Sequence, residues 1–402
     1  MLFKSLSLIC NHPIKTKIMK STLFIPVIFA AIISLGFNSS NANSKDKPKI
    51  EKPAVENTKI QVALLLDTSS SMDGLIDQAK SRLWNIVNTL TTLKYDGKAP
   101  DIEIALYEYG NDGLSQKSNY IRQITPLSTD LDLISEKLFA LKTNGGNEYC
   151  GAVIQDATKQ LQWAKESNNM KLIYIAGNEE FNQGGVSYKQ AISNALKNDI
   201  YVNTIFCGDK KEGISILWKD GADYGKGKYF NIDANQAVEY IATPYDDEIS
   251  KCDEKINKTY INYGAKGAVK KMNQAIQDQN AKKVSAANYT DRAVSKSKAV
   301  YKNESWDLVD KVKDDAAAIS KLKKEELPAE LQNKSTAELE QIVTEKKKER
   351  ETIQKEISVL AKKRQQYIET ESKKTKKQDD LGNTINTSIV AFAKVKGYTV
   401  EK

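Results

Sequence analysis

The sequence predicts an α/β fold with a doubly wound, mostly parallel sheet, followed by an all-helical, coiled-coil-like C-terminal region. The first observation is that short apolar runs alternate with segments of helical periodicity across residues 58–262. Parallel strands need crossover connections, which are usually helices, so this alternation favours a parallel sheet covered on both faces. The second observation is that strand signals fade after residue 262, where Lys, Glu, Gln and Ala dominate.

The expected elements follow one another almost regularly in residues 58–262. Strands are expected over 60–66, 101–109, 120–125, 172–176, 200–207 and 228–232. Helices are expected over 75–93, 131–141, 152–163, 188–196 and 214–222, because apolar residues recur there at helical spacing. Open α/β sheets bind ligands at the carboxyl ends of their strands, so the residues that follow each strand are the candidates for function.

Residues 263–402 are expected to form a helical hairpin or coiled coil. Ser335 and Glu338 fit a capping box at the start of a long helix, and Leu327-Pro328 interrupts the helical stretch before it. Apolar residues then recur at spacings that largely sum to sevens, which is typical of helix pairing. They are Leu339, Ile342, Ile353, Ile357, Leu360 and Tyr367. Self-association through these helices is therefore expected.

Residues 1–42 have the features of a presequence with a signal peptide. Lys20 supplies a positive charge, an apolar run of about 15 residues follows, and small residues precede an expected cleavage point near Ala42. The run is too short for a spanning helix, which needs roughly 20 residues, so no anchor is expected after cleavage. Residues 43–57 are a polar linker, and translation starts at either Met1 or Met19. An exported protein, periplasmic or extracellular, is predicted.

Composition excludes several classes of function. The chain of 402 residues has a net charge of +8, and four lysines but no acid precede the cleavage point, so the mature chain carries only +4. That balance gives no reason to expect a nucleic-acid partner. The single histidine, His12, lies in the presequence. Its loss excludes Ser-His-Asp and Cys-His catalytic sites and any histidine-ligated metal.

Oxygen-bearing side chains gather directly after the first expected strand. Asp67, Ser69 and Ser71 stand at alternate positions of the turn between this strand and the first helix. Such spacing can direct one carboxylate and two hydroxyls toward one point. Mg²⁺ and Ca²⁺ prefer oxygen ligands, and Mg²⁺ needs only one or two carboxylates because it keeps several waters.

This D-x-S-x-S pattern after an apolar strand resembles the metal-ion-dependent adhesion site of von Willebrand factor type A (VWA) domains. The resemblance spans roughly residues 58–250, includes the order of the elements, and is to a bacterial secreted branch with a helical C-terminal extension. It implies a non-enzymatic protein-binding module whose metal takes an acidic side chain from a protein partner. In that family a threonine from a Gly-rich loop and an aspartate after the fourth strand complete the site.

Both completing positions differ here. Asn147 or Glu148 stands where the threonine is expected, and Gly177 replaces the aspartate, with Asn178 and Glu179 beside it. Two interpretations stay open. Either Glu148 or Glu179 restores the missing charge and the site binds Mg²⁺ or Ca²⁺, or the site binds no metal and Asp67 only caps the first helix.

Three cysteines remain in the predicted mature chain. Cys150 and Cys207 are both expected at the carboxyl edge of the sheet, so one hypothesis is a disulfide between them with Cys252 free. The other is three buried reduced thiols.

Two functions remain compatible with the sequence. One is a metal-dependent adhesion or assembly module of the cell envelope, and the alternative is a structural envelope scaffold with a metal-free VWA-like domain and an oligomerising helical region. Catalysis is not expected, since Ser69 stands where haloacid-dehalogenase-type phosphatases need a second aspartate.

Overall fold

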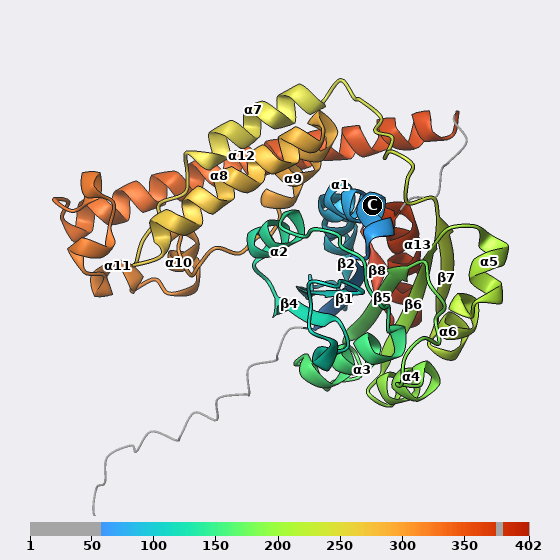
Figure 1. Cartoon of the computed structure of the whole chain (residues 1–402). Coiled ribbons are helices and arrows are strands. Elements are labelled where there is room, and N and C mark those ends of the chain that lie inside the picture. Colours follow the sequence, from blue (N-terminus) through green and yellow to red (C-terminus); the bar gives the residue numbers. More distant parts are fainter. Residues whose placement is uncertain (1–57, 375–380, 402) are drawn as a thin grey trace, which may run out of the picture. The chain divides into compact units, whose positions relative to one another are not determined.

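The computed structural model describes residues 58–374 and 381–401 of the chain (Figure 1). The predicted presequence, signal peptide and polar linker all lie outside the described residues. The first strand of the sheet begins immediately after residue 58, at the start of the described region.

A six-stranded sheet forms the centre of the α/β part. Its strand order is β4-β3-β1-β5-β6-β7, and all neighbours are parallel except the edge pair β3 and β4. The predicted mostly parallel sheet is thus confirmed. The strands are β1 Lys59–Asp67, β3 Asp101–Tyr109, β4 Ile121–Ser128, β5 Met170–Gly177, β6 Ile200–Cys207 and β7 Lys226–Ile232. A two-stranded sheet joins β2 Leu93–Lys94 to β8 Thr399–Val400.

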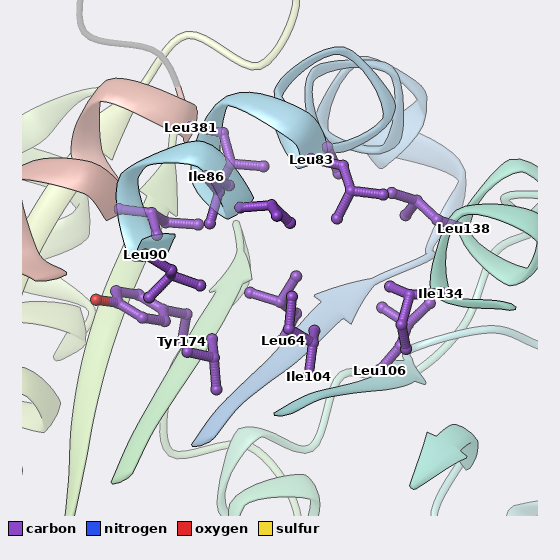
Figure 2. Packing of buried hydrophobic residues seen from close by; sticks show 14 of the residues in the cluster. Leu64, Leu83, Ile86, Leu90, Ile104, Leu106, Ile134, Leu138, Tyr174 and Leu381 are labelled. Carbon is purple, nitrogen blue, oxygen red and sulfur yellow. The ribbon is translucent and has the colours of Figure 1, made fainter. Parts of the chain in front are cut away.

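Helices cover both faces of this sheet. Alternate residues of β1 belong to two separate hydrophobic clusters, Leu64 to one and Leu65 to the other. Helices α1, α2 and α13 contribute to the first cluster, and α3, α4 and α6 to the second. Figure 2 shows the first cluster, where Leu83 of α1 and Leu381 of α13 lie over the strands. The helices are α1 Asp73–Thr91, α2 Leu131–Phe139, α3 Cys150–Gln160, α4 Tyr188–Lys197, α5 Lys210–Ser215, α6 Trp218–Tyr224 and α13 Leu381–Val395.

Helices α7 to α12 stand in the sequence between the last strand of the sheet and one of its covering helices. They are α7 Asp246–Asn257, α8 Gly267–Val284, α9 Ala286–Lys296, α10 Leu308–Asp314, α11 Ala318–Lys321 and α12 Thr336–Ser372. The chain then returns to the sheet, because Ile385 and Ile389 of α13 are fully buried in the same cluster as α1. The expected hairpin over 263–402 therefore describes only part of that region: α13 completes the α/β layers.

The long helix α12 begins as predicted. The apolar residues that recur along it, here called its apolar seam, pack against other helices of the same chain. The Ser335 and Glu338 side chains form the predicted capping box. Ile353 and Ile357 are buried in a cluster with residues of α7 and α9, so they are not free to pair with another molecule. Arg350, which interrupts the apolar repeat, is also buried and binds Asp307 at 2.7 Å. The seam holds the inserted helices together.

Buried ion pairs attach the inserted helices to the α/β part. The guanidinium of Arg292 in α9 is fully buried and binds Asp132 of α2 at 2.7 Å and Asp278 of α8 at 2.6 Å. Lys296, one turn further along α9, binds Asp278 and Asp253 of α7. Charges taken out of water are stable only when paired, so these contacts fix the relative positions of the four helices.

Arg292→Met is predicted to lower the free energy of unfolding by about 3–5 kcal/mol, since the buried Asp132 carboxylate loses its cationic partner and Asp278 keeps only Lys296 as one. Urea unfolding followed by circular dichroism measures the change. Lys334→Met, which removes an exposed pair with Glu338, is the control and should leave stability unchanged. Equal effects of the two substitutions would contradict a structural role of the buried pairs.

Candidate functional site

The turn that follows β1 brings the three predicted oxygen-bearing residues together. Asp67 ends the strand and is fully buried, and its Oδ1 atom accepts a hydrogen bond of 2.7 Å from the backbone N–H of Ser69. The Ser69 and Ser71 hydroxyls lie 3.3 Å apart. One carboxylate and two hydroxyls therefore face the same point at the carboxyl edge of the sheet.

The Gly-rich loop before α3 adds Glu148 to this group. Glu148 is only 4% exposed, and its carboxyl group lies within hydrogen-bonding reach of Asp67 and Ser69, whereas Asn147 is exposed. Gly110 makes this approach sterically feasible. A Cβ atom there would lie 2.7 Å from Glu148 Cγ and 2.8 Å from Asp67 Oδ1, and its φ of +78° also suits glycine.

The two buried carboxyl groups perturb one another. Burial raises the pKa of Asp67 to about 6. Burial, followed by the nearby negative charge of Asp67, raises the pKa of Glu148 to about 9. Asp67 Oδ2 and Glu148 Oε2 are both buried without a hydrogen-bond partner. At neutral pH the pair therefore requires a proton or a cation between its oxygens.

Asn178 contacts the site through Ser71, whereas Glu179 is exposed and hydrogen-bonded outside it. The Asn178 side-chain amide donates a 3.1 Å hydrogen bond to the Ser71 hydroxyl, which leaves its Oδ1 atom buried without a partner. The exposed Glu179 carboxylate instead accepts a hydrogen bond from Gln183 at 3.2 Å. Among the two acidic residues proposed to restore charge, the geometry favours Glu148.

Tyr109 explains why residue 177 is glycine. Its hydroxyl donates a 3.0 Å hydrogen bond to the carbonyl oxygen of Ala176. A Cβ atom on Gly177 would lie 2.5 Å from that hydroxyl and 3.0 Å from Asp67 Oδ2. The tyrosine thus takes the space that a side chain at residue 177 would need. Sequence reasoning missed Tyr109, which ends β3 and carries no motif of its own.

The cysteines of the described region do not form the hypothesised disulfide. Cys150, Cys207 and Cys252 are buried free thiols. Cys150 and Cys207 belong to the hydrophobic clusters on opposite faces of the sheet, so the sheet lies between them. This arrangement corresponds to the alternative of three reduced thiols.

The donor set fits a hard divalent cation. It contains two carboxyl groups, two hydroxyls and the Asn178 amide oxygen, with three of its oxygens buried and unpartnered. Mg²⁺ and Ca²⁺ take such ligands. Within residues 58–374 and 381–401, no group of three or more His, Cys, Asp or Glu side chains is arranged to hold a metal. Any ion here would therefore depend on hydroxyls, an amide and water.

A pocket of about 460 Å³ lies beside this group at the same edge of the sheet. Ser71 and Asn178 line both the site and the pocket, and the rest of its wall comes from Met72, from Cys207 at the end of β6 and from the residues that follow β6 and β7. The Ser71 and Asn178 side of the site is therefore open to this pocket, whereas Asp67 and Glu148 are buried beneath it.

Comparison with known proteins assigns the α/β part. Residues 61–242 match the sequence model of the von Willebrand factor type A domain. No curated protein sequence matches the chain.

Solved structures share part of the arrangement. Proximal thread matrix protein 1 from the mussel byssus, with zinc in its adhesion site, is 16% identical and has a TM-score of 0.33 over 44% of this chain and 42% of that protein. The VWA domain of SpRpn10 is 16% identical over 43% of this chain and 87% of that domain, with a TM-score of 0.31. An aerotolerance-related membrane protein from Bacteroides fragilis is also 16% identical, over 44% and 93%, with a TM-score of 0.31.

Similarities at this level carry no ligand or partner over to this chain. The family assignment depends instead on the match of the sequence model, and domains of this family are typically interaction modules rather than enzymes. Residues 61–242 form a von Willebrand factor type A domain.

Proposed function

We propose that this protein is a metal-dependent protein-binding module of the cell envelope that acts in adhesion or assembly. Asp67, Ser69, Ser71 and Glu148 would hold Mg²⁺ or Ca²⁺, with Asn178 beside them. The observation that carries the proposal is the pair of buried carboxyl oxygens, Asp67 Oδ2 and Glu148 Oε2, which have no hydrogen-bond partner. A bound cation would neutralise both and offer an open position to an acidic group of a protein partner.

The chain prepares this site before any ion binds. The backbone N–H of Ser69 fixes one oxygen of Asp67, and the Asn178 amide fixes the Ser71 hydroxyl. Tyr109 closes the side of the site near residue 177. Ligands held in place by such contacts lose little conformational freedom on binding, which favours affinity.

The alternative function is a structural envelope scaffold with a metal-free domain. The raised pKa of Glu148 supports it, because a proton shared by the two carboxyl groups would also remove the repulsion between two negative charges. The apolar seam of α12 does not support it, since that seam packs against helices of the same chain.

Location in the envelope is also part of the proposal. It depends on the presequence, which lies outside the described residues. None of the helices in residues 58–374 and 381–401 combines the length and the apolar character needed to cross a membrane.

Calorimetric titration with MgCl₂, and separately with CaCl₂, is predicted to show one binding site. Asp67→Asn and Glu148→Gln should each lower the affinity at least tenfold, or about 1.4 kcal/mol, because each removes a charged ligand. Glu179→Gln is the matched control and should lower the affinity far less, as that carboxylate is exposed and bound to Gln183. Absence of binding to the unsubstituted protein, or equal binding by all variants, would refute the metal site.

In the metal-free protein, the contribution of the Asp67–Glu148 pair to stability is predicted to fall as the pH rises from about 4 to about 9. Folding raises the pKa of Asp67 from 3.8 to about 6 and that of Glu148 from 4.5 to about 9, so the folded state holds these protons more tightly than the unfolded state. Their stabilising contribution is complete below the unfolded values and disappears as the pH passes the folded values.

Urea unfolding in chelator at several pH values measures this dependence. Each proton changes the free energy of unfolding by at most about 1.4 kcal/mol per pH unit. Glu148→Gln keeps a hydrogen-bond donor beside Asp67 at every pH, so its profile should be flatter. Identical profiles for the two proteins would show that the pair does not share a proton.

The scaffold alternative predicts self-association that chelator does not change. Sedimentation velocity over a hundredfold range of protein concentration tests it. We expect a single species with no concentration dependence, because the α12 seam is already buried. A concentration-dependent oligomer that persists in chelator would favour the scaffold.

A further inference from the structure

Helix α8 presents a row of apolar side chains to solvent. Val269, Met272 and Ile276 are 69%, 64% and 43% exposed, and the exposed Ala268 and Ala275 lie beside them on the same face. The other large hydrophobic residues exposed in the described part of the chain lie singly on α5, α6, α12, α13 and β8. We call the five residues of α8 the α8 stripe.

The opposite face of α8 is firmly attached to the protein. Gln277 and Ala281 are buried, and Asp278 binds Arg292 and Lys296. On this attached face, Lys270 also forms an ion pair at 2.6 Å with Asp130, the residue that caps the N-terminus of α2. The helix therefore cannot rotate to bury the stripe without breaking buried ion pairs.

Every exposed charge on α8 is positive. Its single acidic residue, Asp278, is buried and paired. Lys282 and Lys283 are exposed beyond one end of the stripe, and Lys266 is exposed before the other. A partner that covers the stripe would meet an apolar strip bordered by ammonium groups, and negative charge at its edges would complement them.

We propose that the α8 stripe docks an amphipathic helix of another protein that has acidic residues beside its apolar face. The stripe residues recur at three- and four-residue intervals, the spacing with which one helix packs along another. Ala268 and Ala275 allow a second helix to approach closely. This surface is independent of the proposed metal site.

Two other occupants fit the stripe less well. A second copy of this chain would bring Lys266, Lys282 and Lys283 of one molecule toward those of the other, and like charges across an interface cost free energy. A membrane surface favours Trp, Phe and Leu on the inserted face of a helix, and the stripe has none.

Fluorescence anisotropy with a defined peptide tests the proposal. The probe is a labelled four-heptad helix with leucine at positions a and d and glutamate at e and g, and the control probe has lysine at e and g. The full-length protein should bind the acidic probe at micromolar concentration and the basic probe at least tenfold more weakly. The double variant Met272→Gln, Ile276→Gln should lose at least tenfold in affinity for the acidic probe.

Matched variants and two further measurements separate the alternatives. Val359→Gln alters an exposed valine of α12 and should leave binding unchanged, and circular dichroism checks that each variant folds. Failure to bind the acidic probe, or equal binding of both probes, would overturn the proposal. Two other results would also overturn it. One is self-association in sedimentation that the double variant abolishes, and the other is binding to vesicles of anionic phosphatidylglycerol that the double variant abolishes.

Discussion

The burial of two carboxyl groups against one another is the constraint on which the site depends. Asp67 and Glu148 come from segments far apart in the sequence, and the fold brings their side chains together with little access to water. Two negative charges that are close together and buried repel strongly, so the arrangement persists only if a proton or a cation lies between them. Gly110, which lacks a side chain, makes room for the pair.

This constraint also changes how the departures from the family pattern are understood. A glutamate in the Gly-rich loop and a glycine at the end of β5 look in the sequence like the loss of two ligands. In the structure, Glu148 supplies a carboxyl group from the loop, and the Tyr109 hydroxyl occupies the space beside Gly177. Asp67 thus keeps its position in the family pattern, and the second carboxyl group comes from the Gly-rich loop instead of the end of β5.

Patterns that depend on neighbouring residues could be predicted from the sequence, and patterns that depend on distant contacts could not. The strand Asp101–Tyr109 and the capping box at Ser335 are confirmed because alternation and capping are local properties. The choice between Asn147 and Glu148 depends on how a loop folds over a distant turn. Arg350 interrupts the apolar repeat of α12, but its buried partner Asp307 lies 43 residues away in the sequence.

Dependence on distant contacts also explains why the expected hairpin over residues 263–402 describes only part of the helical region. The apolar face of α13 looks like one side of a coiled coil, yet it completes the hydrophobic layer over the sheet.

Crystals grown with Mn²⁺, which shares the oxygen ligands of Mg²⁺ and Ca²⁺, would test the central claim, a cation held by Asp67 and Glu148, most directly. The account predicts an anomalous scattering peak between the Asp67 and Glu148 carboxyl groups, at about 2.0–2.6 Å from their oxygens. A map without such a peak, in which the two carboxyl groups are hydrogen-bonded to each other, would contradict it.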